Sequence, residues 1–441
     1  MTDQTAPLGA RAVLRIPDYR RLWAAQGISD IGDALTNLTL LIVVVRLTGS
    51  TAALALMAIA LAVPAIVVGP IAGVFVDRWD RRRVMLASDL LRAGLVLGFI
   101  LGATGDRLPL LYLVAIAHAT IGTFFNPARM ALIPRVVARN GLMAANSLNQ
   151  MTRVIAGVAG AALAGLIVGL AGVAWPAFVI DAATFVVSFS IVLRVRTSGR
   201  VEADPADPHA PHAPHAPHAA TGVFASLRHG LALVVGSPLL LGTMIAAGVT
   251  MLGLGAVNVL FVPLMIRDLQ VPTTWLGAVD AAQTASMILA AGLVATLAAR
   301  ARPTTIVVIG LAGIAVAIGF VGGVTSVWQV IVLLFLMGWF VTPLNAAIGT
   351  IVQTATDDRE RGRVASTLNA VMSAASVLSM ALAGVFGDLL TVRTVFILAG
   401  LVIGSAALTA GVMFRRKVKA PDAQEPAGVG SGDLTTATSG T

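Results

Sequence analysis

The sequence predicts an all-α integral membrane protein of twelve transmembrane helices in two six-helix bundles. Three observations predict this fold: the composition, the lengths of the apolar stretches and a short internal repeat. Of the 441 residues, 57% are apolar and only 12% are charged, whereas a soluble globular chain carries about 25% charged residues. Because one soluble core cannot bury so much apolar surface, most of the chain is expected to lie in lipid.

Twelve apolar stretches are long enough to cross a bilayer, which takes about 20 helical residues. Six precede a polar break and six follow it: 22–46, 52–76, 84–104, 109–131, 145–170 and 173–194, then 238–265, 275–299, 304–323, 326–350, 364–388 and 392–414. The first stretch is too long for the core of a cleavable signal peptide. The predicted order is a cytoplasmic tail (1–19), a first bundle (20–196), a linker (197–236), a second bundle (237–415) and a C-terminal tail (416–441).

A short repeat relates the two halves. The segment AANSLN from Ala144 to Asn149 aligns with VASTLN from Val364 to Asn369 at an offset of 220 residues. Both segments lie at the junction between the fourth and fifth spans of their half. Parallel repeats of this kind are related by an axis along the membrane normal, and the substrate path is then expected between the halves.

The basic residues are distributed unevenly over the connections. The odd-numbered connections contain four of them, Arg46, Arg107, Arg267 and Arg393, while most others lie in the even-numbered connections and the tails. This bias predicts a multi-pass protein of the cell membrane with both termini in the cytoplasm. The net charge of +9 is therefore expected to face anionic lipid, and nucleic acid is not an expected partner.

The linker contains Pro-His-Ala repeats that place His209, His212, His215 and His218 three residues apart. Spaced histidines can chelate a metal, but the composition favours an extended, solvated spacer. The C-terminal tail after Lys419 is rich in Gly, Ser and Thr and is predicted to be disordered.

The connection after the second span carries the motif GVFVDRWDRRR from Gly73 to Arg83. This motif resembles the cytoplasmic loop motif of the major facilitator superfamily. Gly73 would let the second helix pack closely, and Asp77 suits the positive end of a neighbouring helix. The resemblance implies an inner gate that latches against the second half in the outward-facing state. The predicted gate residues are Gly73, Asp77, Arg78, Arg81 and Arg82, with the region near Arg363 as the matching surface.

Further segments are similar to a branch of proton-driven drug exporters that includes macrolide-efflux and siderophore-export proteins. They are FNPAR at Phe125–Arg129, IPR at Ile133–Arg135 and AANSL at Ala144–Leu148. The resemblance covers about residues 17–415 and implies efflux by alternating access. One departure is the fifth span, where Gly157–Gly165 lacks the Gly-Pro pair associated with antiport in such exporters.

Charges inside the spans are the candidate functional groups, because each costs about 2.5–3.5 kcal/mol at a helix centre on insertion scales. Asp33 lies near the middle of the first span and is the first candidate for a proton-carrying carboxylate, with Asp30 on the same face. Arg153 in the fifth span is its expected counter-charge. A purely structural ion pair of Asp33 is the alternative. Asp280 in the eighth span is a further candidate for proton coupling or gating.

Three other polar residues lie in the first bundle. Asp89 and Arg92 stand three residues apart in the third span, so they are expected to neutralise each other. Asp181 is expected near the end of the sixth span, as a cap or an anchor. His118 can titrate near neutrality, although a lone histidine on an apolar face is more often a packing residue.

Neutral polar residues in the spans are expected to contact substrate or to join helices. They are Gln26, Asn37, Asn258, Gln283 and Asn345. A cavity with few fixed charges favours hydrophobic or amphipathic substrates over sugars and multivalent anions. The sequence has no phosphate-binding Gly-rich loop, hydrolase elbow or metalloprotease motif, so an enzyme, a cofactor and a resident metal are not predicted.

The favoured prediction is a monomeric secondary transporter that exports small hydrophobic or amphipathic compounds, such as drugs, in exchange for protons. Two alternatives stay open. One is export of an endogenous metabolite such as a siderophore, and the other is a non-transporting membrane sensor or scaffold.

Overall fold

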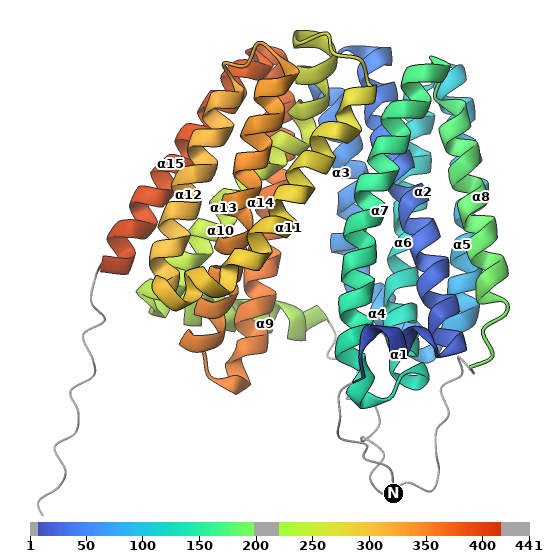
Figure 1. Ribbon diagram of the computed structural model, residues 1–441, viewed down its shortest axis with the longest axis horizontal. Coiled ribbons are helices and arrows are strands. Elements are labelled where there is room, and N and C mark those ends of the chain that lie inside the picture. Colours follow the sequence, from blue (N-terminus) through green and yellow to red (C-terminus); the bar gives the residue numbers. More distant parts are fainter. Residues whose placement is uncertain (1–7, 198–219, 416–441) are drawn as a thin grey trace, which may run out of the picture.

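The computed structural model describes residues 8–197 and 220–415, in which every regular element is a helix (Figure 1). The four linker histidines and the C-terminal tail lie outside these residues. Eleven helices are long and apolar enough to cross a membrane, and one bent pair brings the number of spans to twelve. The prediction of an all-α membrane protein with twelve spans is confirmed.

Each half of the chain contributes six spans. The first half consists of α2 (Pro17–Thr48), α3 (Thr51–Val67) with α4 (Gly69–Arg78), α5 (Arg81–Thr104), α6 (Leu108–Val136), α7 (Leu142–Ala171) and α8 (Trp175–Val192). The second half consists of α10 (Pro238–Pro263) with the π-helix η2 (Leu264–Asp268), α11 (Thr274–Arg300), α12 (Pro303–Val321), α13 (Val327–Ala355), α14 (Asp358–Leu389) and α15 (Val392–Arg415). Three shorter helices are α1 (Ala10–Leu14), η1 (Arg139–Gly141) and α9 (Ala220–Gly236).

The second span is broken, which the apolar pattern did not predict. Its two parts, α3 and α4, meet at Val68 with a bend of 46°. Pro64 lies in the last turn of α3 and Pro70 in the first turn of α4. Because proline lacks a backbone N–H and crowds the preceding turn, two prolines so close together end one helix and start the next.

The helices pack in the same pattern in both halves (Figure 1). In the first half α2 packs against α7 and α8, and in the second half α10 packs against α14 and α15. The two repeat segments therefore lie at equivalent places, at the start of α7 and in the first turns of α14. Apolar side chains such as Leu101, Leu170 and Leu408 are exposed on the outer surface, as lipid contact requires.

The two halves meet at the end of the bundle opposite to the described chain ends, which we call the far end (Figure 1). One contact joins α7 to α11, where a Cβ on Gly277 would collide with the backbone of Ala162. The other joins α3 to α14, where Gly384 lies against Ala55. Small residues let these helix backbones approach closely. The hydrogen bonds between the halves among the described residues also belong to this end.

Candidate functional site

The centre of the first half holds a polar cluster built around Asp33 on α2. The Asp33 carboxylate forms an ion pair with the Arg92 guanidinium on α5. Arg92 is only 7% exposed, and its guanidinium lies 4.2 Å from the centre of the Phe185 ring. Gly122 on α6 leaves room for this guanidinium, since a Cβ there would lie 3.5 Å from Arg92 Cζ.

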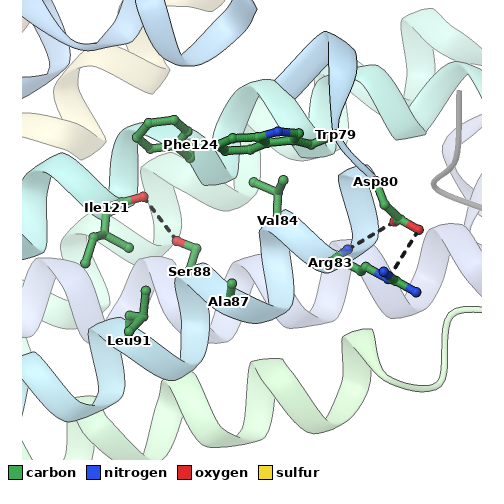
Figure 2. A pocket seen from close by; sticks show the side chains of 9 residues that line it. All are labelled: Trp79, Asp80, Arg83, Val84, Ala87, Ser88, Leu91, Ile121 and Phe124. Carbon is green, nitrogen blue, oxygen red and sulfur yellow. Dashed lines mark hydrogen bonds and ion pairs between the residues drawn. The ribbon is translucent and has the colours of Figure 1, made fainter. Parts of the chain in front are cut away.

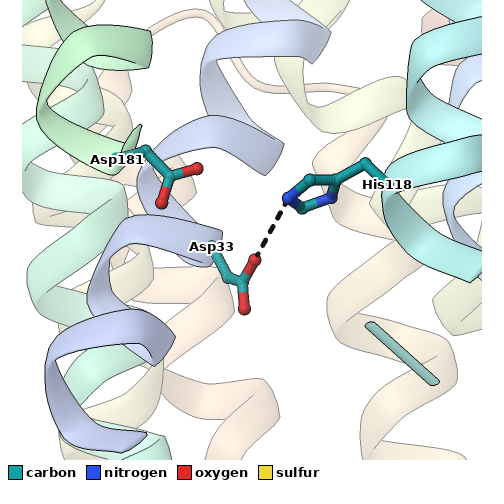
Figure 3. Close-up of side chains that lie close together, drawn as sticks. All are labelled: Asp33, His118 and Asp181. Atoms are coloured by element: carbon teal, nitrogen blue, oxygen red, sulfur yellow. Dashed lines mark ion pairs between the residues drawn. The ribbon is translucent and has the colours of Figure 1, made fainter. Parts of the chain in front are cut away.

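Two further groups reach the cluster from α6 and α8 (Figure 3). His118 Nε2 lies 3.9 Å from Asp33 Oδ1, and its ring packs between Phe99 and Phe185. Asp181 is fully buried and accepts a 2.5 Å hydrogen bond from Thr36 Oγ1. Asp181 lies in the second turn of α8, but it does not cap that helix; its carboxylate faces α2.

The predicted ion pair between Asp89 and Arg92 is also wrong. Asp89 is buried and accepts a 2.7 Å hydrogen bond from Ser188 Oγ, whereas Arg92 turns to Asp33. The spacing of three residues does place Asp89 and Arg92 on one face of α5. However, that face contacts both α6 and α8, and the two side chains select different partners there.

The predicted counter-charge Arg153 does not pair with Asp33. Its Nη2 donates a 3.4 Å hydrogen bond to Asn126 Oδ1 instead. Asp30, one turn before Asp33, accepts a 3.1 Å hydrogen bond from the buried Gln26. The Gln26 side chain thus forms a hydrogen bond within α2, and it does not line either of the cavities described below.

A cavity of about 490 Å³ opens onto the Asp33 cluster. Its polar lining includes Asp30, Asp33, Arg92 and His118, and its wall is completed by residues of α3, α4 and α6. We call this the proton cavity, for the titratable groups in its wall. The cavity brings Asp30 and Asp33, the carboxylates of α2 predicted for proton coupling, together with Arg92 and His118, for which structural roles were predicted.

A second cavity, of about 320 Å³, lies between the halves, and we call it the central cavity. Asn37 of α2, Asn258 of α10 and Gln283 of α11 line it, as predicted for substrate contacts. Asp280 is its charged group and makes no hydrogen bond or ion pair with the described residues. The remaining predicted residue, Asn345, is exposed and lines neither cavity.

Asn37 lines both cavities. It follows Asp33 by one helical turn on α2, so the two side chains lie on the same face.

The predicted gate motif occupies α4 and the start of α5, and Gly73 and Asp77 do not make their predicted contacts in this conformation. Gly73 makes no close helix contact, because a Cβ there would have no neighbour within 4 Å. Asp77 caps no helix. Asp80 caps α5 instead, accepting from the backbone N–H groups of Arg82 and Arg83 at 3.0 and 3.1 Å. A cap is most often the residue directly before the helix, and Asp80 holds that position.

The basic residues of the motif bind within their own half. Arg82 donates to the backbone carbonyls of Val192 and Leu193 at the end of α8, at 3.3 and 2.5 Å. Asp77 and Arg78 are exposed. Neither forms a hydrogen bond to Arg363 or to other described residues of the second half. The motif is thus not engaged with the second half in this conformation.

Beside the motif, a membrane-facing groove of about 490 Å³ runs between α4, α5 and α6 (Figure 2). Trp79 stacks on Phe124 with ring centres 6.4 Å apart, and Arg83 pairs with Asp80 at the rim.

The far end is closed by a group that sequence reasoning missed. Asp388, in the last turn of α14, accepts hydrogen bonds from the backbone N–H groups of Thr51 and Ala52 at 2.7 and 3.1 Å. It also accepts from Ser50 Oγ at 2.5 Å. An acidic side chain in the last turn of a helix opposes the negative end of the helix dipole. This unfavourable position in its own helix could have indicated from the sequence that Asp388 binds the N-terminus of another helix.

The sequence of this chain matches the family model of the Major Facilitator Superfamily over residues 22–257 and 243–438. The chain belongs to this superfamily. The enterobactin exporter EntS of Salmonella choleraesuis is 25% identical over 382 residues, which are 85% of this chain and 87% of that protein. The superfamily assignment confirms a transporter fold and points to a transporter rather than an enzyme.

Solved structures of superfamily-type transporters share the fold. A point mutant of the nucleoside transporter NupG superposes with a TM-score of 0.72 at 12% identity, over 90% of this chain and 100% of that chain. A bacterial homologue of the iron transporter ferroportin in an inward-facing state superposes with a TM-score of 0.70 at 14% identity. The superposition covers 91% of this chain and 98% of that chain. The prediction of a superfamily member that resembles siderophore-export proteins is confirmed. The chain is a multi-pass membrane protein, and members of its superfamily carry small molecules, generally as monomers and without a cofactor.

Proposed function

We propose that this chain is a proton-coupled exporter of a small metabolite of the siderophore type. The observation that carries the substrate class is the likeness to enterobactin exporters along 85% of the chain. This likeness does not specifically support drug efflux, the main prediction from sequence. The central cavity is consistent with an amphipathic cargo, since three amides and one carboxylate face an otherwise apolar wall.

Proton coupling would use the ion pair of Asp33 and Arg92. When Asp33 takes up a proton, its attraction for the guanidinium is lost and Arg92 is freed for another carboxylate. Asp89 and Asp181 both lie within the same cluster. Protonation thus changes the contacts between α2, α5 and α8 without moving a charge into lipid. Asn37, one turn along α2, would transmit this change to the cargo.

Alternating access would proceed by rocking of the two halves about the central cavity. We take the chain ends to be cytoplasmic, from the bias of the basic residues. In that orientation the conformation described here is closed to the outside by Asp388 and by the contact of α7 with α11. The gate motif would engage the second half in the opposite state.

The test is uptake of enterobactin by proteoliposomes into which the purified protein is inserted, with and without an imposed pH gradient. We expect accumulation that depends on the gradient. Asp33→Asn should abolish the gradient-driven part while cargo binding is retained. Asp106→Asn, a change at an exposed loop carboxylate, is the matched control and should transport normally.

Two other results would contradict this proposal. Gradient-driven transport of amphipathic drugs but not of enterobactin would return the substrate to the drug class. A folded protein that moves neither class would support the sensor or scaffold alternative.

A further inference from the structure

The Asp33 cluster contains more carboxylates than cations. Asp33, Asp89 and Asp181 face a single guanidinium, that of Arg92. The other charged groups on the neighbouring helices, Arg129 on α6 and Arg153 on α7, act on Asp30 toward the terminal end of α2. Neither of these two arginines pairs with a carboxylate of the cluster; both donate to Asn126. When all three carboxylates are ionised and His118 is neutral, the cluster has an excess of two negative charges.

His118 adds a vacant ligand atom to this site. The side chain is 4% exposed, and its Nε2 has no hydrogen-bond partner. Aromatic rings on two sides fix the imidazole plane, and Nε2 points toward the Asp33 carboxylate (Figure 3). A buried polar atom without a partner is unfavourable, so this orientation indicates a ligand that the side chain is positioned to bind.

The geometry fits a single metal ion. One ligand atom each from Asp33, His118 and Asp181 lie within 4.8 Å of one another. Metal–nitrogen and metal–oxygen bonds of about 2.0–2.2 Å hold such ligands about 3–4 Å apart, so small side-chain rotations close the site. Asp33 uses Oδ1 for Arg92, and its Oδ2 has no hydrogen-bond partner among the described residues. The proton cavity gives an ion a route to Asp33 and His118.

We propose that Asp33, His118 and Asp181 form a binding site for one divalent first-row transition-metal ion. The imidazole ligand favours ions such as Zn²⁺, Fe²⁺ or Co²⁺ over Mg²⁺ and Ca²⁺, which prefer oxygen ligands. Thr36 and Thr184 orient the Asp181 carboxylate by hydrogen bonds, in the manner of groups that position metal ligands. A divalent ion also cancels the excess charge of the cluster.

Metal and protons then compete for the same groups, since a carboxylate or imidazole must be deprotonated to bind a metal. Binding is expected to be tighter at pH 8 than at pH 6. Arg92 is a second competitor because it holds Asp33. The proposal concerns binding alone, so its failure would leave the proposed transport function untouched.

The experiment is a Co²⁺ titration of the purified full chain in detergent, followed by visible absorption and by calorimetry. The reference protein carries Ala at His209, His212, His215 and His218 and has no polyhistidine tag, so that the linker does not bind the ion. We expect one Co²⁺ per chain with the absorption of a nitrogen- and oxygen-ligated ion. Zn²⁺ should displace it.

Variants locate the site. His118→Ala should weaken Co²⁺ binding by at least about tenfold, and Asp181→Asn should do the same if His118→Ala fails to fold. His229→Ala is the matched control, because His229 lies on α9 against Glu360 and far from the cluster in sequence. Arg92→Gln should bind Co²⁺ more tightly than the reference. Absence of saturable binding, or equal affinity in the reference and the folded cluster variants, would overturn the proposal.

Discussion

Asp388 of the second half caps the first turn of α3 in the first half through the backbone N–H of Thr51. A cap is normally supplied by the residue that precedes its own helix. Ser50 holds that position and accepts from the backbone N–H of Ala53. Asp388, 337 residues after Thr51 along the chain, adds bonds to the N–H groups of Thr51 and Ala52 that exist only while the far end is closed.

Asp388→Ala should therefore favour opening of the far end. Loss of a cap costs about 1 kcal/mol, which corresponds to about a fivefold change in the ratio of closed to open molecules. The chain has no cysteine, so spin labels can be attached at Thr104→Cys in the first half and Leu389→Cys in the second. The distance between the two labels then reports how far the halves are separated at the far end. The distance distribution should gain a longer component. An unchanged distribution would show that the cap does not hold the gate.

Gly277→Ala should also separate the halves, because the added methyl group meets the Ala162 backbone. Overpacking of this kind costs about 1–3 kcal/mol. Gly292→Ala on the same helix is the matched control, since a Cβ there has no neighbour within 4 Å. We expect slower transport and a wider far end for the first variant alone. Equal behaviour of the two variants would contradict the close contact of α7 with α11.

Arg92→Gln should destabilise the protein. Removing one partner of a buried ion pair costs about 3–5 kcal/mol, so the melting temperature should fall clearly. Arg153→Gln, which removes a single long hydrogen bond to Asn126, should change the melting temperature little.

Asp80→Ala and Asp77→Ala should separate two roles within the gate motif. Asp80 caps α5, so its loss should reduce stability by about 0.5–2 kcal/mol. Asp77 is exposed and caps nothing here, so its loss should leave thermal stability unchanged and alter the transport rate. Unfolding curves and proteoliposome transport measured on both variants check this. A destabilised Asp77→Ala protein would contradict the assignment.

The lengths of the apolar stretches were sufficient to predict the twelve spans, because the thickness of the bilayer sets a similar minimum length for every spanning helix. The position of Asp33 in the middle of a span also followed from those lengths. Its partner did not follow from them. Arg92 is 59 residues away on another helix, and spacing along one helix reveals which side chains share a face but not which faces meet.

The same limit explains Asp181 and the bend in the second span. Asp181 was expected to act as a cap or an anchor near a helix end, yet it accepts a hydrogen bond from Thr36 across a helix contact. Pro64 and Pro70 were visible in the sequence, but proline in a membrane helix can be accommodated by neighbouring groups. Only the packing of α3 and α4 determines that the helix breaks there.

The bend at Val68 gives the second span a joint between its two gates. Asp388 holds the α3 part at the far end, while the α4 part carries the gate motif at the terminal end. A straight helix would transfer every movement of one end to the other. With a bend of 46° between them, we expect α4 to close onto the second half before α3 is released, which would let the transport cycle pass through an occluded state that seals the cargo from both sides at once.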